Sequence, residues 1–119
     1  MSENRKNFRT SIGSYISVNE QNNMANAGFL KDISSKGLRI KSTKSYIPRR
    51  SYKLVVSLPD SDNSLKKVAV DTEVIWSKES DIAGYYETGF EFSELNNNFE
   101  QIEQFIENSG NLAQFIFPN

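Results

Sequence analysis

Two stretches in the middle of the chain alternate between apolar and polar side chains with a period of two residues. In the first, the apolar positions before Pro59 are Tyr52, Leu54, Val56 and Leu58. In the second, after a polar segment at 60–64, the same face carries Val68, Val70, Thr72, Val74 and Trp76. Because successive side chains of a strand point to opposite faces, this spacing predicts two strands, each with one buried face, joined by a hairpin.

Further strands are predicted on either side of this hairpin, at residues 12–18, 24–33, 38–41 and 86–92. The run from Asn19 to Asn23 predicts a turn, and residues 42–51, with Pro48, predict a loop. Successive strands of antiparallel type, each with one apolar face, are typical of a barrel or a sandwich. The chain is therefore predicted to be mostly β, and these patterns leave both architectures open.

The period changes near the C-terminus. Apolar side chains recur there at three- and four-residue spacing, at Phe99, Ile102, Phe105 and Ile106. Asn97 with Glu100 resembles a capping box, and Gly110 is predicted to end the helix. The apolar tail at 112–117 is expected to pack on the sheet, with docking to a partner as the alternative.

Length and composition exclude several kinds of chemistry. A chain of 119 residues fits one domain with a real core, and it shows no internal repeat or linker. It has no cysteine and no histidine, which excludes disulfides, thiolate zinc sites and the commonest general base. No carboxylate pair suggests a metal site or a glycosidase, so we expect no enzyme, no metal and no cofactor.

The N-terminal residues contain charges but no apolar core of a signal peptide, and no run of 18 apolar residues occurs anywhere. We therefore expect no membrane span and a cytoplasmic location. The net charge of −1 supplies no general attraction for nucleic acid, so any anion site has to be local.

Two arginines lie four residues apart near the N-terminus, at Arg5 and Arg9. Arginine offers planar, two-pronged donation that suits phosphate oxygens or the acceptor edge of a purine. In an extended chain the pair would be about 13 Å apart and could hold both ends of a dinucleotide. In a helical turn their Cβ atoms would be only ~5–6 Å apart and would clamp a single group.

A second motif, Asp32-x-Ser34-x-x-Gly37, falls at a predicted strand end and turn. On a strand, Asp32 and Ser34 would share one face while Ile33 points into the core. Gly37 suits a position that needs a positive φ or a close approach of the backbone to a ligand. Together the two motifs indicate a receptor site for a nucleotide.

Each of these residues also has a simpler interpretation. Arg5 and Arg9 could be solubilising charges on a disordered start, and Asp32 and Ser34 could bond the local backbone, as such residues do in turns. We favour ligand binding because both motifs are present. Trp76 is expected in the core, with stacking on a base as the alternative, whereas Lys36 and Arg39 are expected on a solvated face.

This set of residues resembles the PilZ family, the receptor domains for bacterial cyclic di-GMP. The resemblance covers nearly the whole chain. It rests on the two motifs and on three strand segments, Leu38-Arg39-Ile40, Val74-Ile75-Trp76 and Gly89-Phe90-Glu91-Phe92.

The resemblance implies a six-stranded antiparallel β-barrel with a C-terminal α-helix that binds cyclic di-GMP. Residues 1–11 would be a ligand-binding arm and residues 12–119 the barrel with its helix and tail. The implied ligand-binding residues are Arg5, Arg9, Asp32, Ser34 and Gly37.

Three functions are weighed. The leading one is a non-catalytic cyclic di-GMP receptor whose arm closes over the ligand and signals to a downstream protein partner. The second is an adaptor of the same fold that binds no nucleotide and acts through protein contacts in a motility, pilus or secretion assembly. The third, binding of a single-stranded nucleic-acid polymer, needs a basic groove with exposed aromatic side chains, and both the charge and the inward aromatic stripes argue against it.

Overall fold

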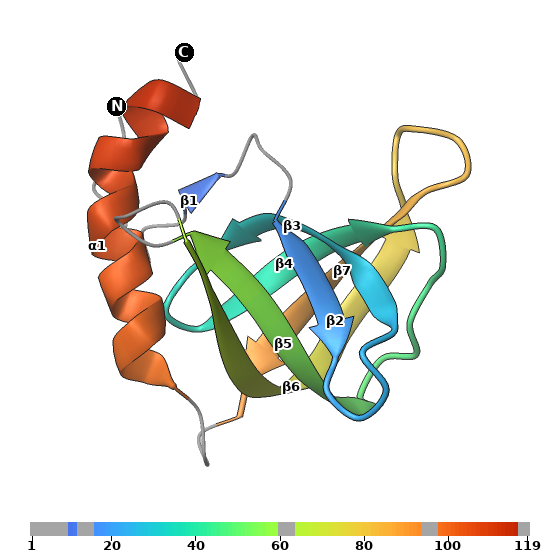
Figure 1. The fold of residues 1–119 in the computed structure, drawn as a ribbon. Coiled ribbons are helices and arrows are strands. Elements are labelled where there is room, and N and C mark those ends of the chain that lie inside the picture. The colour runs from blue at the N-terminus through green and yellow to red at the C-terminus, as the bar shows by residue number, and fades with distance from the viewer. Residues whose placement is uncertain (1–9, 12–15, 60–63, 94–97, 117–119) are drawn as a thin grey trace.

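The computed structural model describes residues 10–11, 16–59, 64–93 and 98–116, and for 10–11 and 108–116 it describes the backbone alone. These residues form strands and one helix (Figure 1). In chain order the elements are β1 (Thr10–Ser11), β2 (Ser17–Glu20), β3 (Asn26–Ile33), β4 (Gly37–Ser42), β5 (Ser51–Pro59), β6 (Leu65–Glu79), β7 (Tyr86–Phe92) and α1 (Phe99–Ile116).

Six of the strands close into an antiparallel barrel. The strand order is β3-β2-β5-β6-β7-β4, and pairing of β4 with β3 completes the ring. The two-residue strand β1 pairs with the end of β3, beside the position where β2 pairs further along the same strand. The predicted barrel is therefore confirmed, and the sandwich that the alternation also allowed is wrong.

The alternation along β5 and β6 produces the core as predicted. Leu54, Val56, Val70 and Val74 are each at most 1% exposed. Thr72, on the same stripe, is buried as well, and its hydroxyl donates to the carbonyl of Tyr52 at 2.9 Å. A polar side chain at this position therefore keeps its hydrogen bond inside the barrel.

The last residue of the predicted inward face of β6, Trp76, does not face inward. A β-bulge between Val74 and Trp76 places Val74 opposite Phe90 and Trp76 opposite Gly89, so β6 contributes one residue more than β7. The extra residue reverses the facing of everything after it, and Trp76 lies half-buried on the outer wall. The expectation that Trp76 lies in the core is wrong for this reason.

The predicted turn at Asn19–Asn23 begins too early. Asn19 and Glu20 still belong to β2, where they pair with Val55 and Leu54 of β5. The chain turns over residues 21–23, and the side chain of Asn23 accepts a hydrogen bond from the amide of Ala25 at 2.9 Å. The first part of the strand predicted at 12–18 lies outside the described residues.

Helix α1 lies along one side of the barrel and packs with Ile102 and Phe105, which are 1% and 7% exposed (Figure 1). The predicted end at Gly110 is wrong, because the helix continues to Ile116. An interior glycine costs only about 1 kcal/mol, and the residues after it, from Asn111 to Ile116, are all compatible with a helix. The predicted cap, Asn97, and the packing of the tail lie outside what the structure describes.

No helix within the described ranges combines the length and the apolar character needed to cross a membrane.

Candidate ligand-binding site

The second motif folds into the tight turn between β3 and β4. The amide of Ser34 donates to the carbonyl of Gly37 at 2.9 Å and closes the turn. The hydroxyl of Ser34 accepts from the amide of Lys36 at 3.2 Å, a local contact typical of serine in turns. Ser34 is 0% exposed, so its described role is to hold the shape of this turn.

Gly37 is required because two backbones approach closely. A Cβ at this position would lie 2.1 Å from the carbonyl oxygen of Phe90 on β7, closer than any real contact allows. Gly37 does not adopt a positive φ. The predicted positive φ is therefore wrong, the close approach that the structure shows is to the backbone of β7, and the predicted approach to a ligand stays a prediction.

The next residue of the motif, Asp32, is almost completely buried, with 2% of it exposed. Its carboxylate accepts a hydrogen bond from Nε of Arg39 at 3.0 Å and a second one from Nη2 of the same guanidinium. A register shift between Leu30 and Asp32 disturbs the alternation of β3, and Ile33 and Ser34 are both 0% exposed. Ile33 belongs to the core, as predicted, and its neighbours Asp32 and Ser34 are buried as well.

Glu87 on β7 joins the same group of charges. Its carboxylate accepts from the ammonium of Lys31 at 2.6 Å, and its other oxygen lies 3.9 Å from Nη1 of Arg39. The hydrogen bond from Lys31 lowers the pKa of Glu87; burial opposes this, and the positive charges of Lys31, Arg39 and Lys41 add to it. The ionised form of Glu87 is therefore favoured in the folded protein.

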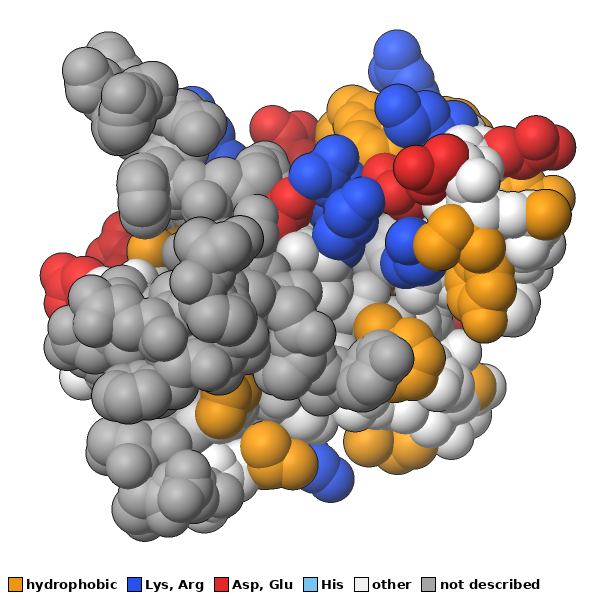
Figure 2. Space-filling view, turned by 90° about the horizontal axis from the view of Figure 1, so that it is seen from above, with side chains coloured by type: hydrophobic (Ala, Val, Ile, Leu, Met, Phe, Trp, Pro, Cys, Tyr) orange, Lys and Arg blue, Asp and Glu red, His pale blue; other side chains and the backbone are white. Residues whose placement is uncertain are grey.

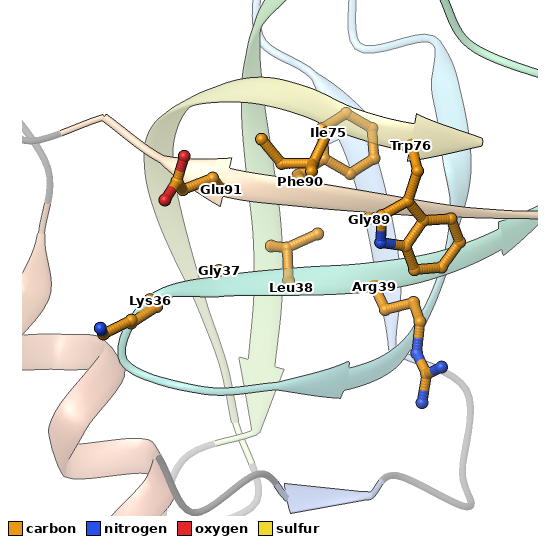
Figure 3. A pocket seen from close by; sticks show the side chains of 9 residues that line it. All are labelled: Lys36, Gly37, Leu38, Arg39, Ile75, Trp76, Gly89, Phe90 and Glu91. Carbon is orange, nitrogen blue, oxygen red and sulfur yellow. The ribbon is translucent and has the colours of Figure 1, made fainter. Parts of the chain in front are cut away.

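A pocket of about 480 Å³ opens beside this group (Figure 3). Arg39 of β4 and Trp76 of β6 line it, and Gly89 of β7 pairs with both of them in the sheet. Because Gly89 has no side chain, the indole lies directly over its backbone, where a Cβ would be 2.7 Å from Cε2 of the ring. The pocket thus offers an aromatic group, a fixed guanidinium and a glycine floor.

The rest of the lining gives the pocket a mixed character. Lys78 places its ammonium 5.3 Å from the centre of the Trp76 ring. The remaining lining residues are Lys36, Gly37, Leu38, Ile75, Phe90 and Glu91. On the part of the molecule drawn in colour in Figure 2, Lys and Arg side chains lie directly beside Asp and Glu side chains. Attraction for an anion is therefore confined to individual groups.

The structure brings together three of the five predicted site residues. Asp32, Ser34 and Gly37 surround the β3–β4 turn, and Gly37 borders the pocket. Arg5 and Arg9 lie outside the described residues. The backbone that follows them is described, and in it Thr10 pairs with Ile33 and Ser11 pairs with Asp32.

The residue patterns did not indicate Arg39 as a candidate and placed Trp76 in the core, whereas both line the pocket. For Arg39 a signal was present: on a strand whose inward residues are Leu38 and Ile40, it has to face outward, and a tight turn after Asp32 sets the two opposite each other. Its side chain faces outward, as expected, but is only partly solvated, with 32% exposed, because it bonds Asp32. For Trp76 no signal existed, because a bulge cannot be read from alternation.

Among the described residues, no group of three or more acidic side chains is placed to hold a metal ion.

Several solved structures share this fold. The PilZ domain of YcgR from Escherichia coli with c-di-GMP matches with a TM-score of 0.68 at 15% identity, covering 94% of this chain and 95% of that one. The MrkH–c-di-GMP complex of K. pneumonia matches with a TM-score of 0.72 at 17% identity, covering 96% and 56%. The Bacillus subtilis inhibitor of motility, MotI/DgrA, matches with a TM-score of 0.69 at 18% identity, covering 92% and 52%.

The chain therefore spans about half the length of MotI and MrkH and nearly all of the YcgR domain. No curated protein sequence matches it. The family model described as "PilZ domain" matches residues 3–108, which include both motifs, the barrel and the first half of α1. The chain belongs to the PilZ domain family.

Proposed function

We propose that this protein is a non-catalytic receptor for cyclic di-GMP. The observation that carries the proposal is the pocket beside the β3–β4 turn, where Arg39 and Trp76 flank a glycine floor next to Asp32 and Gly37. Family membership supports it, as do the YcgR and MrkH structures, which contain c-di-GMP in a barrel of this kind.

The N-terminal arginines complete the proposed site. Arg9 directly precedes β1, and the backbone of β1 pairs with Ile33 and Asp32 of the motif. A chain leaving β1 therefore starts beside the turn, and Arg5 and Arg9 need to span only a few residues to meet a ligand there. Both guanidiniums would bind phosphate oxygens or the acceptor edge of guanine.

Closure of this arm would be the signal. Ordering a short segment costs conformational entropy, and binding to the nucleotide would offset that cost. A downstream protein partner would then recognise the ordered arm or the adjacent barrel face.

Titration calorimetry with cyclic di-GMP, alongside GMP and cyclic di-AMP, tests the proposal. We expect micromolar binding of cyclic di-GMP and much weaker binding of the other two. Arg9→Ala and Asp32→Ala should each abolish this binding while the circular dichroism spectrum stays that of a folded barrel.

Matched controls come from exposed residues away from the pocket. Arg50→Ala and Asp81→Ala remove the same side-chain types and should bind like the wild type, because both residues are exposed and neither lines the pocket. Unchanged affinity in both site variants would show that the site is wrongly assigned. Failure of the wild type to bind would favour the adaptor that acts through protein contacts alone.

A further inference from the structure

A second pocket, with a volume of about 300 Å³, opens at the end of strands β3 and β4 that is remote from the β3–β4 turn. Strand β4 contributes its first residues to the pocket beside Arg39 and its last residues to this one. The loops after β4 and before β7 lie on the side of the barrel away from α1 (Figure 1). Residues 26–29, residues 41–44 and Tyr85 line the second pocket, and we call it the lysine pocket.

Hydrogen bonds fix the β3 and β4 sides of the lysine pocket. The hydroxyl of Tyr46 donates to the carbonyl of Ala27 at 2.8 Å and ties the loop after β4 to the start of β3. The hydroxyl of Ser42 donates to the carbonyl of Lys44 at 2.8 Å and holds the backbone that follows β4. A pocket that is formed in advance loses less conformational freedom on binding, which favours affinity.

The charged side chains that line the lysine pocket are Lys41 and Lys44, and none of its described lining residues is acidic. The ammonium of Lys44 lies 3.6 Å from a carboxylate oxygen of Glu20, and the lysine side chain is 53% exposed. Lys41 pairs across the sheet with Glu87, whose carboxylate accepts its hydrogen bond from Lys31. A long surface ion pair such as Lys44–Glu20 contributes little, so this ammonium can also bind a carboxylate of a partner.

Two aromatic side chains line the lysine pocket beside these charges. Phe29 pairs with Lys41 across β3 and β4 and is 40% exposed. Tyr85 is 40% exposed as well, and its amide donates to the carbonyl of Ile82 at 3.1 Å, which fixes the turn before β7. Aromatic side chains in a concave part of the surface are typical of protein interfaces, where a few apolar anchors carry most of the binding energy.

We propose that the lysine pocket is the docking site for an acidic segment of a partner protein, in which Asp and Glu flank a Leu or an aromatic side chain. The apolar side chain would pack against Phe29 and Tyr85, and the flanking carboxylates would bind Lys41 and Lys44. A volume of about 300 Å³ suits one or two such anchors and is at the lower end for a small molecule.

Charge complementarity decides the choice of partner. Two ammonium groups without an acidic residue in the described lining attract carboxylates and disfavour a basic segment. A nucleic-acid strand would also bring negative charge, but the net charge of −1 gives this protein no wider attraction for a polyanion. The inference does not depend on cyclic di-GMP, since the lysine pocket shares no lining residue with the pocket beside Arg39.

NMR titration of the isotope-labelled protein with the blocked peptide Glu-Asp-Leu-Phe-Glu-Asp tests this inference, with no nucleotide present. We expect amide shifts at residues 26–29, 41–44 and 85, and a dissociation constant between micromolar and millimolar, because so small an interface binds weakly. The peptides Lys-Lys-Leu-Phe-Lys-Lys and Glu-Asp-Ser-Ser-Glu-Asp should each bind at least about tenfold more weakly. Raising the salt from about 50 to about 500 mM should weaken binding of the first peptide.

Variants of the lining separate its charged and apolar parts. Lys41→Gln combined with Lys44→Gln should weaken peptide binding about tenfold or more, and so should Tyr85→Ala alone. If the variant at the partly buried Lys41 does not fold, Lys44→Gln and Tyr85→Ala decide the matter, because both residues are exposed.

Matched controls come from exposed residues that do not line the lysine pocket. Lys53→Gln combined with Lys67→Gln removes the same charge from β5 and β6, and Leu65→Ala removes an apolar side chain that is exposed on β6. All of these variants should bind the peptide like the wild type.

Four outcomes overturn the inference: no binding of the acidic peptide, shifts confined to other residues, equal losses in pocket and control variants, or tighter binding of oligothymidylate at the same residues. Dimers that form through Lys41 and Lys44 would also overturn it, because a second copy of the chain would then occupy the pocket. Since no nucleotide is present, failure of the protein to bind cyclic di-GMP would contradict the proposed function and leave this result unaffected.

Discussion

Two glycines shape the site through the space that they leave empty. Gly37 lets β4 approach the carbonyl of Phe90, and Gly89 lets the indole of Trp76 lie on the backbone of β7. Neither adopts a positive φ. Each glycine is therefore needed because a Cβ would clash with a neighbouring strand, and this clash can be recognised only when the strand pairing is known.

Gly89→Ala should displace the Trp76 ring, because the new Cβ would lie 2.7 Å from Cε2 and Nε1. We expect a loss of about 1–3 kcal/mol in the free energy of unfolding, as for other overpacked sites. Since the chain has one tryptophan, its fluorescence reports this ring alone and should shift in the variant. Lys67→Ala, at an exposed position on β6, the strand that carries Trp76, should leave the spectrum unaltered. An unshifted spectrum in Gly89→Ala would contradict the predicted displacement of the ring.

At the scale of the element, strand β6 and helix α1 follow their hydrophobic periods only in part. The alternation of β6 buries Val68, Val70 and Val74, and the bulge then moves Trp76 to the outer wall. In α1 the three- and four-residue spacing correctly identifies Ile102 and Phe105 as the buried face. The residue expected to end the helix was less informative, since α1 continues past Gly110.

Docking of α1 should depend on Ile102, which is 1% exposed and belongs to the barrel core cluster. Ile102→Ala should lower the free energy of unfolding by about 2–5 kcal/mol, through lost burial and the cavity left behind. Glu103→Ala, on the exposed side of the same turn, should change it by no more than about 0.5 kcal/mol. Urea denaturation of both variants tests this, and equal stability of the two would show that the helix does not pack as described.

At the scale of the whole molecule, the barrel is closed by β3, β4 and β7, and charged side chains on the outer wall link these three strands. Arg39 of β4 bonds Asp32 of β3, and Lys31 of β3 bonds Glu87 of β7. The pocket lined by Arg39 and Trp76 opens on the same wall, between β4, β6 and β7. Closure of the fold and formation of the site therefore depend on shared residues.

The stability of the barrel should depend on pH through Glu87. Its pKa is lowered from 4.5 in the folded protein, chiefly by the hydrogen bond from Lys31, so the folded state favours the ionised form. This contribution is fully present above the unfolded pKa and is lost as the pH falls through the folded value. The stability difference between wild type and Glu87→Gln should therefore be greatest near neutral pH and shrink with acidification.

Urea denaturation at a series of pH values between about 6 and about 3 measures this difference. Glu73→Gln, at an exposed carboxylate on β6, serves as the control. A difference between wild type and Glu87→Gln that stays constant over the range would contradict the assigned role of the Lys31 hydrogen bond.

The residue patterns alone predicted a β fold, most of its strands, the buried face of α1 and a site around Asp32, Ser34 and Gly37. These features depend on local spacing: a period of two or of three and four residues, and the chemistry of a turn, are properties of neighbouring residues. The choice of a six-stranded barrel came from the family resemblance, because alternation is the same in a sandwich.

Tertiary structure decided which of these side chains are buried and which line the pocket. Asp32 bonds Arg39 because β4 returns beside β3, and Trp76 lines the pocket because a bulge in β6 turns it outward. Both outcomes depend on register between strands that are distant in sequence. A register is set by the packing of the whole barrel, and no spacing along a single segment encodes it.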